Sequence, residues 1–313
     1  MFKQVIKKSV LFHRKYGGFT GGHLKVYDYF NHCLLIEGLN PEIYIDPVSD
    51  LSHLWKASGS ILANYDPHDH DILFLAGNDW QALDNFPSIE EKKIVLNLIQ
   101  HVRHADPSQD LFQYLRKRAI RICVSYEVAE AVLSTGICNG PVYVIPNGIN
   151  FEILPASASF PSCDVVIAGL KQPVLANALS QELIKNGYSV DLLVSQLPRQ
   201  EYLSRISRGR VVVTLPNSSE GFYLPALEAM AMGLLVVCPD CVGNRSFCRH
   251  RLTCMVPDFS VDSLAQSVTT LLADPVLASQ LRRNSQYACR HYDIRRERED
   301  FGSLMRELIS DSF

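Results

Sequence analysis

Short apolar runs alternate with segments of helical periodicity along the chain, and this alternation restricts the fold more than any other feature of the sequence. In the first half it predicts strands at 9–13, 42–45, 72–76, 94–99, 120–124 and 142–145, and helices at 23–37, 110–118 and 126–135. In the second half it predicts strands at 164–168, 189–194, 211–215 and 234–238, and helices at 173–186, 199–207, 225–232, 261–273, 275–291 and 295–310. Strands that alternate with helices favour an α/β fold with mostly parallel sheets and helices on both faces.

An irregular stretch at 150–163 interrupts this alternation. It contains Pro155, Pro161 and three serines between 157 and 162, which is typical of a linker. The 313 residues also exceed what one hydrophobic core usually supports. We therefore expect two Rossmann-like domains with parallel sheets facing a cleft, at residues 1–155 and 156–292. The last segment, 293–313, is expected to be a helix that packs back on the N-terminal domain.

Composition excludes several classes of protein. The net charge of -3 gives no excess of basic residues for a phosphate backbone, so we expect no nucleic-acid partner. Lysines interrupt the N-terminus before a signal peptide could form, and no run of about 18 apolar residues occurs. Nine scattered cysteines indicate reduced thiols in a reducing compartment. We expect a cytoplasmic protein, and the sequence leaves open a loose contact with the inner face of the membrane.

The segment 215–233 carries the clearest chemical signal. A predicted strand ends at Leu215, a polar loop follows, and Pro225 is placed to start a helix. The backbone N–H groups of Gly221, Phe222, Tyr223 and Leu224 are then expected to be unpaired at the helix N-terminus, where they suit a diphosphate. Two acids, Glu220 and Glu228, flank the same place, and their carboxylates can accept hydrogen bonds from sugar or ribose hydroxyls.

With its two glutamates separated by seven residues and its Ala-Met-Ala-x-Gly ending, this segment resembles the signature of retaining GT-B glycosyltransferases of family 4. The resemblance implies a GT-B fold with an acceptor-binding N-terminal domain and a donor-binding C-terminal domain. It implies that Glu220 contacts the transferred sugar, that Glu228 contacts the donor ribose, and that the backbone of 221–224 holds the diphosphate.

Weaker similarities extend through the first half of the chain. Gly17-Gly18 and Gly21-Gly22 are similar to the glycine loop that borders diphosphate and acceptor in this family, and 142–149 is similar to its Ile-Pro-Asn-Gly stretch. By the same resemblance, His101 at a strand end contacts the transferred sugar, although a surface histidine fits the sequence equally well. The segments 17–23 and 78–80 are expected to hold the acceptor, and Trp80 suits either sugar stacking or core packing.

Two departures from the family pattern concern the donor. Many members place an arginine and a Lys-Gly pair after the first strand of the second domain, whereas this chain offers Lys171 alone. Arg199, Arg205, Arg208 and Arg210 lie further along, at spacings that match no known pattern. Tyr223 also replaces the glycine usual after Glu-Gly-Phe, which places a bulkier group near the sugar.

Three other sequence patterns resemble known functional sites but fit them poorly. The glycine spacing does not match the dinucleotide fingerprint, which argues against a nicotinamide dehydrogenase. Asp69-His70-Asp71 precedes a predicted strand, at the wrong end for a metal-binding DxD triplet. The cysteines at 238, 241, 248 and 254, with His250, offer only one close pair, so reduced thiols are favoured over zinc.

The resemblance implies a metal-independent enzyme that moves a sugar from a nucleotide-diphosphate sugar to a carbohydrate or glycoconjugate acceptor, in polysaccharide or glycoconjugate synthesis. No cofactor or bound metal is expected. Two alternatives stay open at this stage. One is a binding subunit that has the fold but has lost catalysis. The other is an inverting transferase or an epimerase of the same fold.

Overall fold

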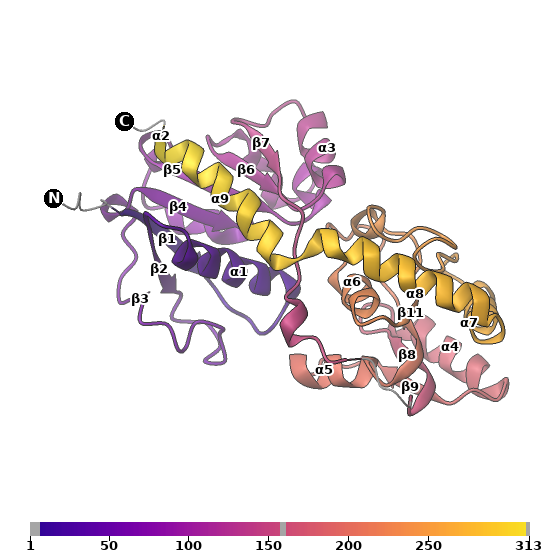
Figure 1. Ribbon diagram of the computed structural model, residues 1–313. Coiled ribbons are helices and arrows are strands. Elements are labelled where there is room, and N and C mark those ends of the chain that lie inside the picture. The colour runs from indigo at the N-terminus through magenta and orange to yellow at the C-terminus, as the bar shows by residue number, and fades with distance from the viewer. Residues whose placement is uncertain (1–6, 157–160, 311–313) are drawn as a thin grey trace. The chain divides into compact units, whose positions relative to one another are not determined.

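The computed structural model describes residues 7–156 and 161–310, and its contacts divide the chain into two compact units (Figure 1). Unit 1 comprises residues 1–147 and 297–313, and unit 2 comprises residues 148–296. The division thus falls after Asn147, whereas the sequence-based prediction placed it after residue 155. Residues 157–160 of the expected linker lie outside the described residues.

Unit 1 contains a parallel sheet whose seven described strands run in the order β3-β2-β1-β4-β5-β6-β7. The strands are β1 (Lys8–Arg14), β2 (Leu39–Ile45), β3 (Ile61–Leu62), β4 (Ile72–Ala76), β5 (Ile94–Ile99), β6 (Ile120–Cys123) and β7 (Val142–Val144). Because the central strands are buried on both faces, they consist of nearly continuous apolar residues, as in β4.

Neighbouring residues of a strand pack against different helical layers of unit 1, because side chains alternate between the two faces of a sheet. Phe12 and Phe74 pack with rings of α1 (Gly21–Leu35) and α9 (Ile294–Ser310). Leu11 and Leu73 instead pack against Trp80 and its neighbours. Figure 1 shows α9 beside α1, although α9 is the last helix of the chain.

The remaining helical elements of unit 1 are short. They are η1 (Pro67–Asp69), η2 (Gly77–Leu83), α2 (Ile89–Lys92), η3 (Val102–Ala105), η4 (Asp110–Arg116) and α3 (Tyr126–Ser134). The predicted helix at 110–118 is therefore a 3-10 segment, and η2 and β3 were not predicted. Helix α1 ends at Leu35, two residues before the predicted end at 37, with Ile36 as an extended C-cap; Gly38 follows with φ +88°, a conformation that favours glycine.

Unit 2 contains a second parallel sheet, with four described strands in the order β11-β10-β8-β9. The strands are β8 (Cys163–Ala168), β9 (Val190–Leu193), β10 (Gly209–Thr214) and β11 (Leu235–Val237). The helices are α4 (Pro173–Lys185), α5 (Arg199–Ile206), α6 (Leu224–Ala231), α7 (Val261–Ala273) and α8 (Pro275–Cys289), with the short segments η5 (Phe151–Ile153), η6 (Val242–Asn244) and η7 (Arg290–Tyr292).

The strand β10 shows how this sheet is covered. Val211 and Val213 pack in a cluster with α4, α7 and α8, whereas Val212 packs in a cluster with α5 and α6. The helices therefore cover both faces, as the alternating sequence pattern predicts. Among the described residues, no helix is both long and apolar enough to cross a lipid bilayer.

Candidate active site

The carboxyl ends of β8 and β10 bring Lys171 and Glu220 together in unit 2. Lys171 follows β8, and its Nζ lies 2.5 Å from Oε1 of Glu220, in the loop after β10. The same ammonium lies 5.4 Å from the centre of the Tyr223 ring. The backbone N–H of Asn217 also donates to Glu220 Oε1, at 3.3 Å. In a parallel sheet, strand ends meet at one edge, which explains how residues 49 positions apart become neighbours.

Arg199 engages the second glutamate of the signature. Arg199 is the first residue of α5, and its guanidinium contacts both carboxylate oxygens of Glu228 on α6, with Nη1 3.1 Å from Oε2 and Nη2 bonded to Oε1. Glu228 is almost completely buried, so this forked ion pair is the main compensation for its charge. The sequence named Arg199 only as one of four candidate cations.

The other three arginines of that group differ in their surroundings from Arg199. Arg205 pairs with Asp191, and Arg210 lies 3.0 Å from Asp164. Arg208 donates to the Ser204 hydroxyl at 3.4 Å. The sequence could not show which of the four arginines meets Glu228, because their sequence contexts are similar. The tertiary structure identifies Arg199.

The backbone N–H groups expected to hold a diphosphate are partly occupied. The N–H of Tyr223 donates to the carbonyl of Gly243 at 2.8 Å, and that of Leu224 donates to the carbonyl of Phe222 at 3.2 Å. The expectation that all four groups from Gly221 to Leu224 are unpaired is therefore wrong, because the η6 loop packs against this segment. Helix geometry still leaves the N–H of Ala226, in the first turn of α6, without an intrahelical acceptor, and Pro225 has no N–H.

Gly243 permits this close packing. A Cβ added at Gly243 would lie 2.5 Å from the backbone nitrogen of Phe222 and 2.8 Å from the carbonyl oxygen of Glu220. The next residue, Asn244, is buried and bonds to the carbonyl of Pro239 at 2.8 Å and to Cys238 Sγ at 3.2 Å. The two residues thus shape the loop behind Glu220.

The neighbouring cysteines are free thiols, and Cys238, Cys241, Cys248 and Cys254 are buried. Burial raises the pKa of Cys241 to about 12, which keeps that thiol protonated at neutral pH. Within residues 7–156 and 161–310, no group of three or more His, Cys, Asp or Glu side chains could hold a metal ion.

The glycine loop of unit 1 lies after β1, where Gly18 has φ +106° and a larger side chain would be strained. Thr20 caps α1 by accepting from the N–H of His23 at 3.2 Å. Gln100, which follows β5, donates to the carbonyl of Gly22 at 3.2 Å. The ends of β1 and β5 and the start of α1 therefore meet at the edge where open α/β sheets bind ligands.

His101 lies at the same edge, directly after Gln100, and caps η3. Its Nδ1 accepts from the backbone N–H of Arg103 at 3.1 Å. The strand before it spans 94–99, as predicted. Its proposed contact with the sugar stays a prediction.

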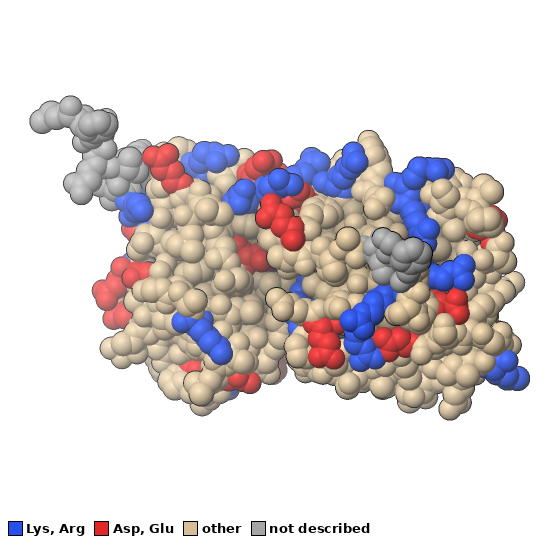
Figure 2. Space-filling view, turned by 60° about the horizontal axis from the view of Figure 1, so that its bottom comes forward, with Lys and Arg blue, Asp and Glu red and all other residues tan. Residues whose placement is uncertain are grey.

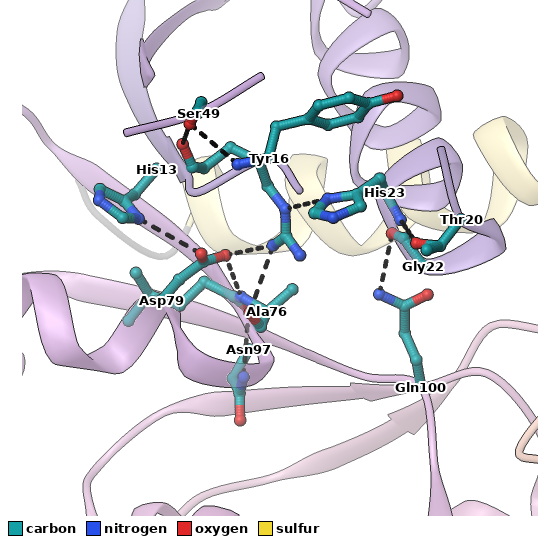
Figure 3. A network of polar contacts seen from close by, with 12 residues as sticks. His13, Tyr16, Thr20, Gly22, His23, Ser49, Ala76, Asp79, Asn97 and Gln100 are labelled. Carbon is teal, nitrogen blue, oxygen red and sulfur yellow. Dashed lines mark hydrogen bonds and ion pairs between the residues drawn. The ribbon is translucent and has the colours of Figure 1, made fainter. Parts of the chain in front are cut away.

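A polar network not predicted from the sequence occupies the ends of β1 and β4 (Figure 3). Arg14 is the last residue of β1, and its Nη1 lies 2.5 Å from Oδ2 of Asp79 in η2. The same guanidinium donates from Nε to Nδ1 of His23 at 2.9 Å. Asp79 also accepts from the N–H of Ala76 at 3.0 Å and lies 3.3 Å from His13 Nδ1. A charged residue at a strand end was the one available sequence signal for Arg14.

Two other predicted features of unit 1 are resolved by packing. Trp80 is buried and stacks on Tyr114 with ring centres 5.8 Å apart, so it is a core residue and does not stack on a sugar. The Asp69-His70-Asp71 triplet lies before β4, as expected, and its Asp71 accepts from the Ser9 N–H at 2.9 Å.

Charged side chains of both signs lie on the face of the molecule that Figure 2 draws. On the face in Figure 2, basic and acidic side chains are interspersed and uncharged residues cover most of the area. That nucleic acid is not a partner stays a prediction from the net charge of -3.

Comparisons with known proteins place these observations in a family context. Residues 151–274 match the family described as glycosyl transferases group 1. No curated protein matches the sequence. The structure is similar to HepE from Anabaena, solved in complex with UDP-glucose, with a TM-score of 0.76 and 15% identity over 96% of this chain and 100% of that one. It is also similar to sucrose-phosphate synthase from Thermosynechococcus elongatus, with a TM-score of 0.69 and 15% identity over 97% of this chain and 100% of that one.

A glycosyltransferase from Rickettsia africae gives a third match, with a TM-score of 0.65 and 14% identity over 97% of this chain and 99% of that one. At such low identity the similarity establishes the fold alone. That fold is the GT-B arrangement of two parallel-sheet units, as predicted from the 215–233 segment.

Proposed function

We propose that this chain, a GT-B glycosyltransferase whose residues 151–274 are of the group 1 family, transfers a sugar from a uridine-diphosphate sugar to a carbohydrate or glycoconjugate acceptor. The observation that carries the proposal is the pairing of each signature glutamate with a cation from a different element. Lys171, after β8, meets Glu220, and Arg199, at the start of α5, meets Glu228. The choice of uridine is supported by the HepE complex with UDP-glucose.

In the proposed site, unit 2 binds the donor. Glu220 contacts the transferred sugar and Glu228 contacts the ribose, as the family resemblance implies. When the bond between the anomeric carbon and the diphosphate breaks, negative charge grows on the leaving diphosphate. Lys171, Arg199 and the first turn of α6 are the groups of unit 2 that supply positive charge there. We propose that this set makes the reaction independent of a metal ion.

The acceptor is proposed to bind at the carboxyl edge of unit 1, between the glycine loop and His101. The acceptor hydroxyl oxygen forms the new bond to the anomeric carbon and its proton passes to the departing diphosphate. Alignment of the oxygen with the anomeric carbon accounts for much of the rate. Retention of configuration and a role in polysaccharide or glycoconjugate synthesis belong to the same proposal and are supported by the family resemblance. The cytoplasmic setting and the contact with a membrane stay predictions from the sequence.

The first experiment is a thermal-shift screen of the purified protein with UDP, GDP, ADP, TDP and CMP, with and without EDTA. A ligand at about 100 times its Kd adds roughly 2.7 kcal/mol of stability. Stabilisation by UDP that EDTA does not remove supports the proposal. Stabilisation by a different nucleotide corrects the base, and loss of the shift in EDTA overturns metal independence.

A second experiment tests catalysis. Glu220→Ala is expected to abolish sugar transfer while the protein stays folded, because the change removes the carboxylate proposed to contact the sugar. Glu201→Ala, at an exposed position of α5, is the matched control and should leave transfer unchanged. Wild-type transfer by the Glu220 variant would contradict the assignment. UDP binding with no hydrolysis or transfer by the wild-type protein would instead indicate a binding subunit.

A further inference from the structure

His23 has two ring nitrogens in different situations. Nδ1 accepts a hydrogen bond from Nε of Arg14 at 2.9 Å. A guanidinium is protonated at every pH that a protein tolerates, and it can only donate. Nδ1 must therefore carry the lone pair, and in the neutral ring the proton is on Nε2. The hydrogen bond from Arg14 thus selects one of the two tautomers.

Arg14 cannot easily turn away from this contact. Its Nη1 is held 2.5 Å from Oδ2 of Asp79 and 3.3 Å from the carbonyl oxygen of Ala76. Asp79 is itself 5% exposed and is fixed by the N–H of Ala76 at 3.0 Å and by the neighbouring His13 ring. Separating the two members of so buried an ion pair would leave an uncompensated charge, which is costly. The side chain of Arg14 is therefore held in this position.

The groups around His23 also keep the ring neutral. Burial and the adjacent Arg14 guanidinium lower the pKa of His23 to about 4, while the more distant Asp79 raises it by less. The ring of Tyr16 covers one side, with ring centres 4.6 Å apart, and burial and Asp50 raise the pKa of that phenol. Thr20 contacts only the backbone N–H of His23. Between about pH 5 and pH 9 the ring therefore carries a single proton.

No protein partner is described for Nε2 of His23 within residues 7–156 and 161–310, and the residue is only partly buried. It lies in the first turn of α1, directly after the glycine loop and beside the ends of β1 and β4. Arg14, itself held by Asp79, thus fixes one nitrogen of a ring whose other nitrogen has no bond described within these residues. Such an arrangement is typical of a site that is organised before its ligand arrives.

We propose that the Nε2–H of His23 is a fixed hydrogen-bond donor to an oxygen of the acceptor substrate, and that Arg14 and Asp79 are positioning residues that hold it in this state. The inference rests on the proposed function, in which unit 1 binds the acceptor. It assigns His23 a donor role that excludes proton abstraction at Nε2, because that nitrogen already carries the proton. The acceptor is recognised there through a hydroxyl or carbonyl oxygen.

The tautomer is tested directly by long-range ¹H–¹⁵N NMR of the ring of His23 from pH 5.5 to pH 9, with His23→Gln to assign its signals. The expected spectrum is that of a neutral ring protonated at Nε2 throughout this range. A signal protonated at Nδ1, or a titration near the ordinary histidine pKa of about 6.5, would overturn the proposal. This measurement needs no substrate, so its result does not depend on the proposed function.

The role of Arg14 is tested by Arg14→Met together with Asp79→Asn, a pair of changes that avoids an unpaired buried carboxylate. In this variant His23 should populate both tautomers and titrate closer to the ordinary value. Arg118→Met, at a surface arginine of the same unit that donates to the Glu91 carbonyl, is the matched control and should leave the His23 spectrum unchanged. An unchanged spectrum in the double variant would overturn the positioning role.

Kinetics test the contact with the acceptor. His23→Leu should raise the acceptor KM about tenfold and leave the donor KM unchanged, because one hydrogen bond to the acceptor is lost. His23→Gln, whose amide N–H reaches a similar place, should recover most of that loss. An unchanged acceptor KM in the leucine variant would overturn the contact even if the tautomer is as expected. If the wild-type protein transfers no sugar, the proposed function fails while the NMR result still stands.

Discussion

The carboxyl edges of the two sheets both carry ion pairs, but the cations of these pairs differ in how far they are exposed to solvent. In unit 1, one buried carboxylate, Asp79, holds an arginine and contacts a histidine from the neighbouring strand. In unit 2, Glu220 pairs with Lys171, whose side chain is 39% exposed, and Glu228 pairs with Arg199, whose side chain is 21% exposed. The cations of unit 2 therefore have more freedom to move than those of unit 1.

This difference has a physical consequence for ligand binding. An exposed ion pair contributes little to stability, so Lys171 can exchange its carboxylate for a phosphate at low cost. A buried pair is costly to break, so the Asp79 network keeps its geometry with or without ligand. We infer that the donor edge adapts to a charged ligand, whereas the edge of unit 1 presents hydrogen-bonding groups that are already in place.

The largest expected effect tests the rigidity of unit 1 away from its edge. Glu297 of α9 is buried. Its Oε2 lies 2.6 Å from Nζ of Lys25 in α1, and its Oε1 lies 3.3 Å from Nε2 of His32. Glu297→Ala removes one of two carboxylates that hold the buried Lys25 ammonium, the other being Asp28 at 2.7 Å. It also removes the partner of His32, so it should cost about 3 kcal/mol or more of unfolding free energy. Urea denaturation measures it. Glu299→Ala, at an exposed position of the same helix, should change the free energy by less than about 0.5 kcal/mol. A small loss for both variants would show that the buried pair does not stabilise unit 1.

The next effect concerns the loop behind Glu220. Gly243→Ala places a methyl group against the backbone of Phe222 and Glu220, which cannot turn aside as a side chain can. We expect a loss of about 3 kcal/mol and weaker nucleotide binding, measured by thermal unfolding and by titration with UDP. Gly59→Ala is the control, since no heavy atom lies within 4 Å of its added Cβ. Equal stability and equal UDP affinity of the two variants would mean that the η6 loop can move to make room for the methyl group.

A pH experiment probes the neutral histidines of unit 1. Burial and the neighbouring charges of Arg103, His101 and Arg121 lower the pKa of His104 to about 3. Below about pH 6.5 the unfolded chain therefore binds a proton that the folded protein does not, so stability falls as pH falls through this range. The loss from this residue should reach about 2 kcal/mol at pH 5.

The comparison is between His104→Gln and the same change at exposed His68, each denatured with urea at pH 7 and pH 5. The His104 variant should lose less stability than wild type between the two pH values, and the His68 variant should follow wild type. A wild-type slope in both variants would place the acid sensitivity elsewhere.

The smallest expected effect sharpens the account of the donor edge. Arg199→Lys keeps a positive charge beside the buried Glu228 but loses the forked contact, so UDP binding should weaken about tenfold, or about 1.4 kcal/mol, while the protein stays folded. Arg205→Lys, on the same helix but paired with Asp191, should leave UDP affinity unchanged. Titration calorimetry measures both affinities. Equal affinities for the two variants would remove Arg199 from the site.

The sequence by itself determined the α/β class, most strand and helix positions, and the signature segment of the donor unit. These follow from local patterns, since apolar runs, helical periodicity and a proline at a helix start act over a few residues. Through a resemblance it also gave Glu220 and Glu228 as acids of the donor site and Lys171 as a candidate cation for the diphosphate. The short η2 and β3 were missed because they have too few residues for a period to show.

Only the tertiary structure decided which of four similar arginines meets Glu228, that Tyr223 and Leu224 have paired N–H groups, and that Trp80 belongs to the core. It also decided that Arg14, Asp79 and His23 form one network across 65 positions of sequence. Each of these facts depends on how parallel strands are ordered in a sheet. That order brings distant strand ends together through long-range contacts, which no short window of sequence contains.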